Sequence, residues 1–207
     1  MTLQQPGCNE VATWLHGFAV YGHRVGHRAR TEVAGGFHHV TARGNRRSVL
    51  FHDEQDYLTL LRHLATAIER FGWCCHSFCL LPNHYHLLVE TPEPNLGRGM
   101  LVVNGSYARY VNWRYKLDGH AFQGPYHDEY VADDSHLVAA CSYIARNPVE
   151  AGLCVRPEDW RWSSYRATAG LDPCPPYLRV DTVRHIFGSA QDFAESCNQV
   201  AEQPGCK

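Results

Sequence analysis

Lysine is almost absent from this 207-residue chain: it occurs only at Lys116 and Lys207, and the other 17 of the 19 basic residues are arginine. Biased codon usage explains such a preference, and so does the better fit of arginine to bidentate phosphate contacts. Acidic residues number 21, so the net charge is −2. The chain as a whole is therefore not strongly basic, and any surface for nucleic acid must be local.

Long apolar runs are also missing, because no stretch of about 18 apolar residues occurs, and we expect no membrane span. Cysteine is present nine times, but no second CxxC pair completes a zinc site. We interpret these cysteines as small buried residues of a cytoplasmic protein. No internal repeat is present.

The length allows one well-buried domain with a small appendage. The apolar segment "VATWLHGFAVYG" lacks a basic leader and a cleavage site, so we treat residues 1–30 as an extension of uncertain order. Residues 31–170 form the predicted functional domain. The proline cluster at 173–176 begins a predicted tail, 171–207, which contains a linker and weak helices.

Hydrophobic periodicity predicts an alternation of strands and helices. Strands are expected at 37–44, 73–81 and 84–91, helices at 55–71, 96–117 and 132–152, and a short extended piece before residue 131. Pro148 is expected to mark the end of the last helix. This order predicts an α+β domain in which helices pack on one face of an antiparallel sheet and leave the other face for a partner or substrate.

The strand "HYHLLVET" carries two histidines where core residues are expected. His84 and His86 are two residues apart, so both point to one face. Two imidazoles make half of a metal site. A chance pair is the alternative in a chain with 14 histidines.

The segment "SYIARNP" supplies the groups that such a site lacks. Tyr143 and Asn147 are four residues apart on a predicted helix and share one face. Two imidazoles and an amide oxygen suit Mg²⁺ or Mn²⁺, with water and phosphate oxygens as further ligands. A tyrosine beside such an ion can attack a phosphodiester and keep the energy of the ester. The alternative for Tyr143 is an ordinary tyrosine packed on the sheet.

Three blocks, "LPNHYHLLVE", "YARYVNWRY…DGHAFQG" and "SYIARNPVEAGL", resemble the single-tyrosine HUH transposases, and most closely their REP-associated tyrosine transposase branch. "HHVTARGNRRSVLFHDEQDY" and "WSSYRA" resemble further landmarks of that branch, so the resemblance covers residues 31 to about 195. It implies the HUH endonuclease fold, a ferredoxin-like sheet. It also implies His84, His86 and Asn147 as metal ligands and Tyr143 as the nucleophile that forms a 5′-phosphotyrosine. The implied substrate is single-stranded DNA beside a hairpin from a palindromic repeat, bound by a monomer or homodimer.

DNA contacts are expected from the basic segment "ARGNRR" and from polar residues of the second block. The expected residues are Arg43, Asn45, Arg46, Arg47, Arg109, Arg114 and Gln123. Arg24, Arg28 and Arg30 precede them. Trp113, Phe122 and Tyr126 can stack on bases. A solvated loop and core packing are the alternatives for these arginines and aromatics.

One segment departs from the family pattern. Where relatives carry basic residues, this chain reads "PYHDEYV", with Pro125, His127, Asp128 and Glu129. The first expected function is a metal-dependent DNA endonuclease and strand-transferase. The departing segment leaves open a degenerate protein that binds hairpin DNA without cutting it. The histidine pair alone also leaves open an unrelated metallohydrolase that uses a metal-bound water.

Overall fold

Four strands form one antiparallel sheet in the computed structural model of the chain, which describes residues 32–199. The strands are β1 (Gly36–Arg43), β2 (Cys74–Leu81), β3 (His84–Thr91) and β4 (His127–Val131). Their order across the sheet is β2-β3-β1-β4. The predicted extension at 1–30, with its three arginines, lies outside the described residues.

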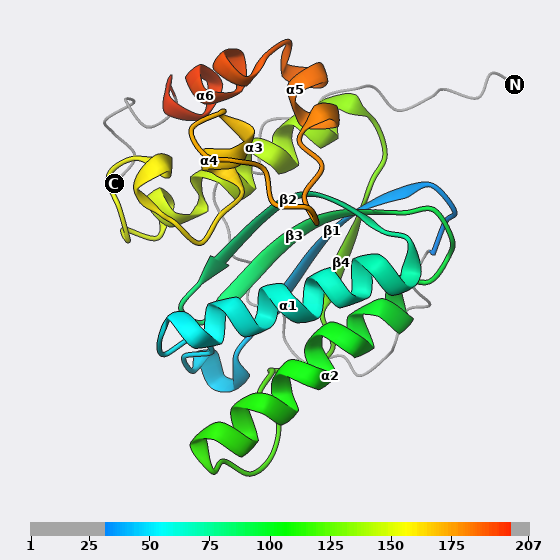
Figure 1. Ribbon diagram of the computed structural model, residues 1–207, viewed down its shortest axis with the longest axis vertical. Coiled ribbons are helices and arrows are strands. Elements are labelled where there is room, and N and C mark those ends of the chain that lie inside the picture. The colour runs from blue at the N-terminus through cyan, green and yellow to red at the C-terminus, as the bar shows by residue number, and fades with distance from the viewer. Residues whose placement is uncertain (1–31, 200–207) are drawn as a thin grey trace, which may run out of the picture.

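Two long helices cover one face of this sheet. α1 (Glu54–Phe71) begins after Asp53, whose side chain accepts a hydrogen bond from the Asp56 N–H, and ends at Gly72, which adopts a left-handed φ of 70°. α2 (Leu96–Tyr115) lies beside it (Figure 1). The element order β1-α1-β2-β3-α2-β4 with both helices on one face is the ferredoxin-like arrangement that the sequence predicts.

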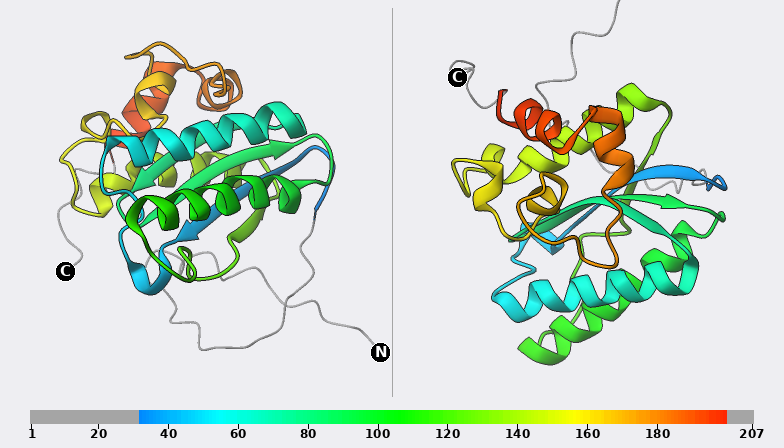
Figure 2. Two further views of the ribbon diagram at one scale, coloured as in Figure 1. Left: turned by 60° about the horizontal axis from the view of Figure 1, so that its bottom comes forward. Right: turned by 45° about the horizontal axis from the view of Figure 1, so that its top comes forward.

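The opposite face is not left free, and here the expectation of helices on one face only is wrong. α3 (Asp134–Glu150) packs against β2 and β3, and three shorter helices follow it: α4 (Tyr165–Thr168), α5 (Asp181–Phe187) and α6 (Ala190–Gln199). Figure 2 shows the sheet between these helices and the α1–α2 layer. The physical reason is that Cys79, Leu81 and Leu88 make this face apolar, so it also needs a cover.

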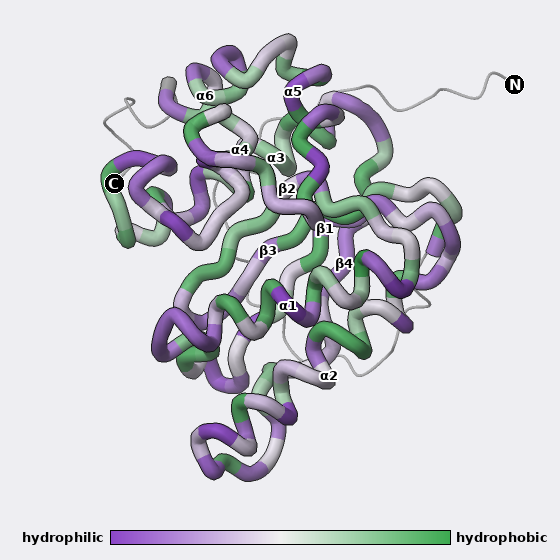
Figure 3. Tube along the Cα trace, in the orientation of Figure 1, coloured by the Kyte–Doolittle hydropathy of each residue, from purple (hydrophilic) through white to green (hydrophobic). Residues whose placement is uncertain are grey.

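Two hydrophobic cores result, one on each side of the sheet. Leu64 and Met100 pack on Val40 and Leu87 beneath α1 and α2. Ile144, Val183 and Phe193 belong to the second core. Hydrophobic and hydrophilic residues alternate along the helices (Figure 3). Such a pattern is typical of helices with one buried and one exposed side.

The predicted C-terminal tail contributes to this second core. Val183 of α5 and Phe193 of α6 are 1% and 2% exposed and contact the layer that α3 forms. The segment is therefore part of the folded body in the described range. Among residues 32–199, no helix is long and apolar enough to cross a membrane.

Candidate active site

The two histidines of β3 lie at one end of the sheet beside β1. The pairing register sets His86 opposite Thr41 and His84 opposite Arg43, so these four residues share one face. The His84 and His86 rings are 5.1 Å apart between centroids and nearly perpendicular, at 79°. The predicted convergence of both imidazoles on one face is confirmed.

One nitrogen of His86 has partners and the other has none. Its Nδ1 lies 3.0 Å from His39 Nε2 and 3.1 Å from Thr41 Oγ1. Its Nε2 is buried and has no hydrogen-bond partner in the described part of the chain. A buried polar atom left unpaired costs free energy, so the site is incomplete as it stands. A lone pair on Nε2 is what a metal ion would use.

The imidazoles at this site are held neutral. Burial lowers the pKa of His84 from 6.5 to about 4, with the Arg43 charge as the second cause. Burial likewise lowers the pKa of His39 to about 4 and that of His86 well below 6.5. The neutral imidazole is the form that ligates metals, so no proton has to leave at neutral pH.

Helix α3 brings the tyrosine and the amide to these histidines. Its N-cap is Asp133, whose carboxylate accepts a hydrogen bond of 2.9 Å from the His136 N–H. The Tyr143 ring stands edge-on to His86, with 5.3 Å between centroids and an angle of 89°. Asn147 is only 6% exposed and hydrogen-bonds with both His84 and Tyr143. The predicted shared face of Tyr143 and Asn147 is confirmed.

The end of α3 differs from the prediction. The helix passes through Pro148 and ends at Glu150. Proline removes only one N–H from the helix, and Pro148 is buried. The Asn147 carbonyl still accepts from Ala151, at 2.9 Å, so the Asn147 backbone is satisfied inside the last turn while its side chain turns to the sheet.

The phenol of Tyr143 is half-buried, and burial is the first cause that raises its pKa above 10. The Glu150 charge acts in the same direction, whereas the hydrogen bond to Asn147 and the Arg43 charge lower the pKa. The balance keeps Tyr143 protonated at neutral pH. A nucleophilic role therefore requires a further positive charge next to the phenol.

The donor set at this site fits a hard divalent cation. Residues 32–199 contain no group of three or more His, Cys, Asp or Glu side chains that could hold a metal ion. The amide of Asn147, beside His84, could supply a third donor, and the His86 Nε2 has no hydrogen-bond partner among the described residues. Two imidazoles and one amide oxygen leave positions for water and phosphate oxygens, as Mg²⁺ and Mn²⁺ prefer.

The sequence reading missed His39. Its ring is 5.2 Å from His86 and 5.8 Å from Tyr143 between centroids. The signal was present, since His39, Thr41 and Arg43 alternate along the predicted first strand and must share a face. What the sequence could not supply is the register that pairs this face with β3.

Five of the predicted DNA contacts gather near His84, at the end of β1. They are Arg43, Asn45, Arg46, Arg47 and Gln123. We call Asn45–Arg47 the arginine turn. The Gln123 N–H donates to the Arg43 carbonyl at 2.9 Å, and the Asn45 N–H donates to the Ala121 carbonyl at 2.9 Å, so the two segments lie side by side.

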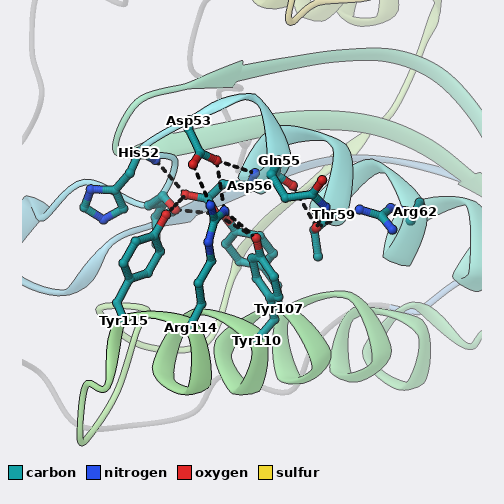
Figure 4. A network of polar contacts seen from close by, with 11 residues as sticks. His52, Asp53, Gln55, Asp56, Thr59, Arg62, Tyr107, Tyr110, Arg114 and Tyr115 are labelled. Atoms are coloured by element: carbon teal, nitrogen blue, oxygen red, sulfur yellow. Dashed lines mark hydrogen bonds and ion pairs between the residues drawn. The ribbon is translucent and has the colours of Figure 1, made fainter.

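The other two predicted contacts, Arg109 and Arg114, lie on α2, and they differ from each other. Arg109 is exposed. Arg114 Nη1 lies 2.6 Å from Asp56 Oδ1, and its Nη2 lies 2.6 Å from Asp53 Oδ2 (Figure 4). Asp56 is fully buried and also accepts from the hydroxyls of Tyr110 and Tyr115. Arg114 therefore joins α2 to the start of α1, and a DNA contact through it stays a prediction.

The three aromatic residues predicted to stack on bases differ in their exposure. Trp113 is 79% exposed, whereas Phe122 and Tyr126 are 7% and 8% exposed and belong to the core beneath α2. Stacking on a base is therefore open to Trp113 and closed to the other two in this conformation.

The two acidic residues of the departing segment, Asp128 and Glu129, lie in β4, and each pairs with a histidine. Asp128 pairs with the buried His38 at 2.9 Å, on the face toward α2. Glu129 lies opposite His39 in the register and pairs with His136 of α3 at 3.4 Å. Both carboxylates therefore face histidines, Asp128 in a buried pair and Glu129 at a half-exposed position.

Comparison with known proteins agrees with this geometry. The family model described as "Transposase IS200 like" matches residues 33–147, more than half of the chain. A curated relative from Haemophilus influenzae named as a REP-associated tyrosine transposase is 26% identical over 109 residues, which are 47% of this chain and 61% of that protein. The match thus spans less than two thirds of the relative.

A solved structure, of a REP-associated tyrosine transposase bound to a REP hairpin, is similar in fold. Its TM-score is 0.62 at 19% identity, and the match covers 75% of this chain and 92% of the other. The fold and family resemblance predicted from the three sequence blocks is confirmed. The chain belongs to the IS200-like transposase family.

Proposed function

We propose that this chain is a metal-dependent endonuclease and strand-transferase for single-stranded DNA, which cleaves beside hairpins through a phosphotyrosine at Tyr143. The observation that carries the proposal is the position of the Tyr143 ring, edge-on to His86 at 5.3 Å, next to a buried Nε2 that has no protein partner. Family membership supports the transposase class.

In this proposal His84, His86 and Asn147 hold Mg²⁺ or Mn²⁺. When bound there, such an ion would neutralise charge on the scissile phosphate and would lower the free-energy cost of forming the Tyr143 phenolate. Thr41 and His39 orient the His86 ring through its Nδ1. Burial on α3 fixes the Tyr143 phenol in front of the same place.

Tyr143 supplies the nucleophile. Its phenolate oxygen forms a bond to the phosphorus while the bond from phosphorus to the 3′-oxygen breaks. The 5′ end stays on the tyrosine, and the 3′-oxygen leaves as a hydroxyl, so the proton that the phenol gives up is balanced by the proton that the 3′-oxygen takes up. Attack of a 3′-hydroxyl on the phosphotyrosine reverses these bond changes and joins a new strand.

Hairpin DNA is the proposed partner, because the arginine turn is exposed beside His84 and the similar solved protein is bound to a REP hairpin. The turn carries Arg46 and Arg47, and Arg43 lies at its base. Arginine forks match phosphate oxygens in pairs, so this end of the sheet suits the backbone of a strand that leads into the site.

The test is to incubate the full chain with labelled single-stranded hairpin oligonucleotides and Mn²⁺ and to resolve the products on denaturing gels. We expect an SDS-stable protein–DNA adduct in the wild type, no adduct with EDTA, and none in Tyr143→Phe. The matched control is Tyr130→Phe, which removes the hydroxyl of an exposed tyrosine on β4.

A wild-type rate of cleavage in Tyr143→Phe would refute the assignment of the nucleophile. Free 5′-phosphate products that survive the loss of Tyr143 would instead support a metallohydrolase with a water nucleophile.

A second candidate is a hairpin-binding protein without cleavage. The observation that favours it is Glu129, whose half-exposed carboxylate lies opposite His39, close to where a phosphate would bind. Tight hairpin binding with no adduct in any divalent cation would support this function over the first.

A further inference from the structure

Asn83 occupies the connection between β2 and β3, directly before His84. The backbone of this connection is held by the segment that follows β1: the Gly44 N–H donates to the Asn83 carbonyl at 2.8 Å, and the Leu50 N–H donates to the Pro82 carbonyl at 2.7 Å. The arginine turn and the start of the β3 strand are therefore neighbours. Asn83 is the residue whose side chain contacts both.

The orientation of the Asn83 amide follows from its two partners. On one side lies the Arg47 carbonyl, 3.3 Å from Nδ2; a carbonyl can only accept, so the amide must present its NH₂ group there. On the other side lies His84 Nδ1, 2.7 Å from Oδ1. Because Oδ1 can only accept, His84 must carry its proton on Nδ1. The second nitrogen of His84, Nε2, is then left with its lone pair.

The same amide holds an unusual backbone. Arg46 and Arg47 have φ values of 52° and 62°, a left-handed conformation that is unfavourable for residues other than glycine. The Asn83 Nδ2–H bond to Arg47 helps to offset that cost, together with the bond from the Arg47 N–H to the Gly44 carbonyl at 2.9 Å. This conformation leaves both arginine side chains exposed.

We propose that Asn83 is a positioning residue that couples the metal ligand His84 to the arginine turn. Its Oδ1 selects the His84 tautomer that can bind a metal, and its Nδ2 keeps the arginines in place for DNA phosphates. The inference rests on the proposed role of His84. It adds a neutral residue that is neither a metal ligand nor the nucleophile.

Three variants of the full chain separate the two contacts of Asn83, the one to His84 and the one to the arginine turn. Asn83→Ala removes both contacts without changing charge. Asn83→Asp keeps an acceptor for His84 and loses the donor to Arg47. Asn83→Ser cannot span both partners and replaces the alanine variant if that one does not fold. Circular dichroism confirms folding of each variant before use.

The first readout is the tautomer of His84 in the metal-free protein, observed by long-range ¹H–¹⁵N NMR. We expect the Nδ1–H form in the wild type and in Asn83→Asp, and a mixture in Asn83→Ala. The second readout is Mn²⁺ affinity by calorimetry without DNA. We expect a loss of about 10- to 100-fold in Asn83→Ala and within about threefold of wild type in Asn83→Asp.

The third readout is hairpin binding in EDTA, where no metal contributes. We expect Asn83→Ala to bind labelled hairpin DNA several-fold more weakly and with a shallower salt dependence, because fewer phosphate contacts form. Since this variant removes no charge, such a change reports the position of the arginines.

The inference is overturned if the wild type forms the adduct while Asn83→Ala keeps wild-type Mn²⁺ affinity, His84 tautomer and hairpin binding. If the wild type binds no Mn²⁺ and forms no adduct, the proposed function is refuted instead, and so is the proposed effect of Asn83 on metal binding. The NMR and EDTA measurements then still decide whether Asn83 orients His84 and the arginine turn.

Discussion

His86 becomes a candidate ligand through side chains that lie far from it in the chain. Thr41 and His39, on the neighbouring strand, occupy its Nδ1 and leave Nε2 unpaired. Tyr143 reaches it from a helix on the other side of the site. The chemistry of this one imidazole is therefore set by contacts from two other elements, and its own sequence neighbours contribute only the alternation that points it there.

A single glycine shows how tightly residues are fitted between α2 and the sheet. A methyl group at Gly99 would lie 2.0 Å from Cζ2 of Trp73, a 3% exposed ring. We expect Gly99→Ala to lower the free energy of unfolding by about 1–3 kcal/mol, because the ring must move in a packed core. Urea denaturation followed by circular dichroism measures the change.

Gly105 on the same helix is the matched control. The nearest atom to a methyl group there is Arg109 Nη1 at 3.7 Å, which is an ordinary contact. Gly105→Ala should raise stability by up to about 1 kcal/mol through helix propensity. Equal effects of the two substitutions would contradict the packing argument.

At the scale of elements, α2 carries two arginines with different roles. Arg114 neutralises the buried Asp56 and the exposed Asp53, and so attaches α2 to the N-terminus of α1. Arg109 lies five residues earlier on an exposed part of the helix. Sequence alone treats both as cations available to DNA, because ion pairs between distant segments leave no local pattern.

We expect Arg114→Ala to lower the urea midpoint of unfolding well beyond the effect of Arg109→Ala, because it leaves the buried Asp56 carboxylate without its cation. Hairpin affinity measured well below the unfolding temperature should stay within about twofold. Arg109→Ala should change stability by less than about 0.5 kcal/mol and is the variant expected to weaken hairpin binding. Fluorescence anisotropy and urea denaturation together measure both effects.

The opposite pattern, with affinity lost in Arg114→Ala at unchanged stability, would assign DNA binding to Arg114 and contradict its role as the link between the helices.

At the scale of the whole molecule, the C-terminal helices complete the layer behind the active site. Phe193 of α6 and Val183 of α5 pack in the same core as Ile144 of α3, which directly follows Tyr143 and lies three residues before Asn147. The expected tail thus stabilises the helix that carries Tyr143, the proposed nucleophile. Its weak helical pattern reflects two short helices whose stability comes from packing and not from their own propensity.

Phe193→Ala should therefore destabilise the whole domain, by about 3–5 kcal/mol, and not only α6. Hydrogen exchange of the β3 amides reports global unfolding and should speed up accordingly. Val155→Ala is the matched control, since Val155 is 82% exposed, and we expect no change beyond about 0.5 kcal/mol. Unchanged β3 exchange in Phe193→Ala would indicate that the C-terminal helices unfold separately.

The sequence by itself determined most of the local structure of this protein and the central residues of its candidate site, His84, His86, Tyr143 and Asn147. Strand alternation, helix periodicity, the Asp133 cap and the Gly72 stop all act within a few residues, so they can be read along the chain. The same holds for the shared face of His84 and His86 and for that of Tyr143 and Asn147.

Only the tertiary structure decided how these pieces meet. The register of β1 with β3 brought His39, Thr41 and Arg43 to the histidines, and the packing of α3 on β2 brought Tyr143 to His86. It also covered the sheet face that was expected to be free. The physical reason is that register, ion pairing and burial depend on complementarity between segments far apart in the chain, which local propensity does not encode.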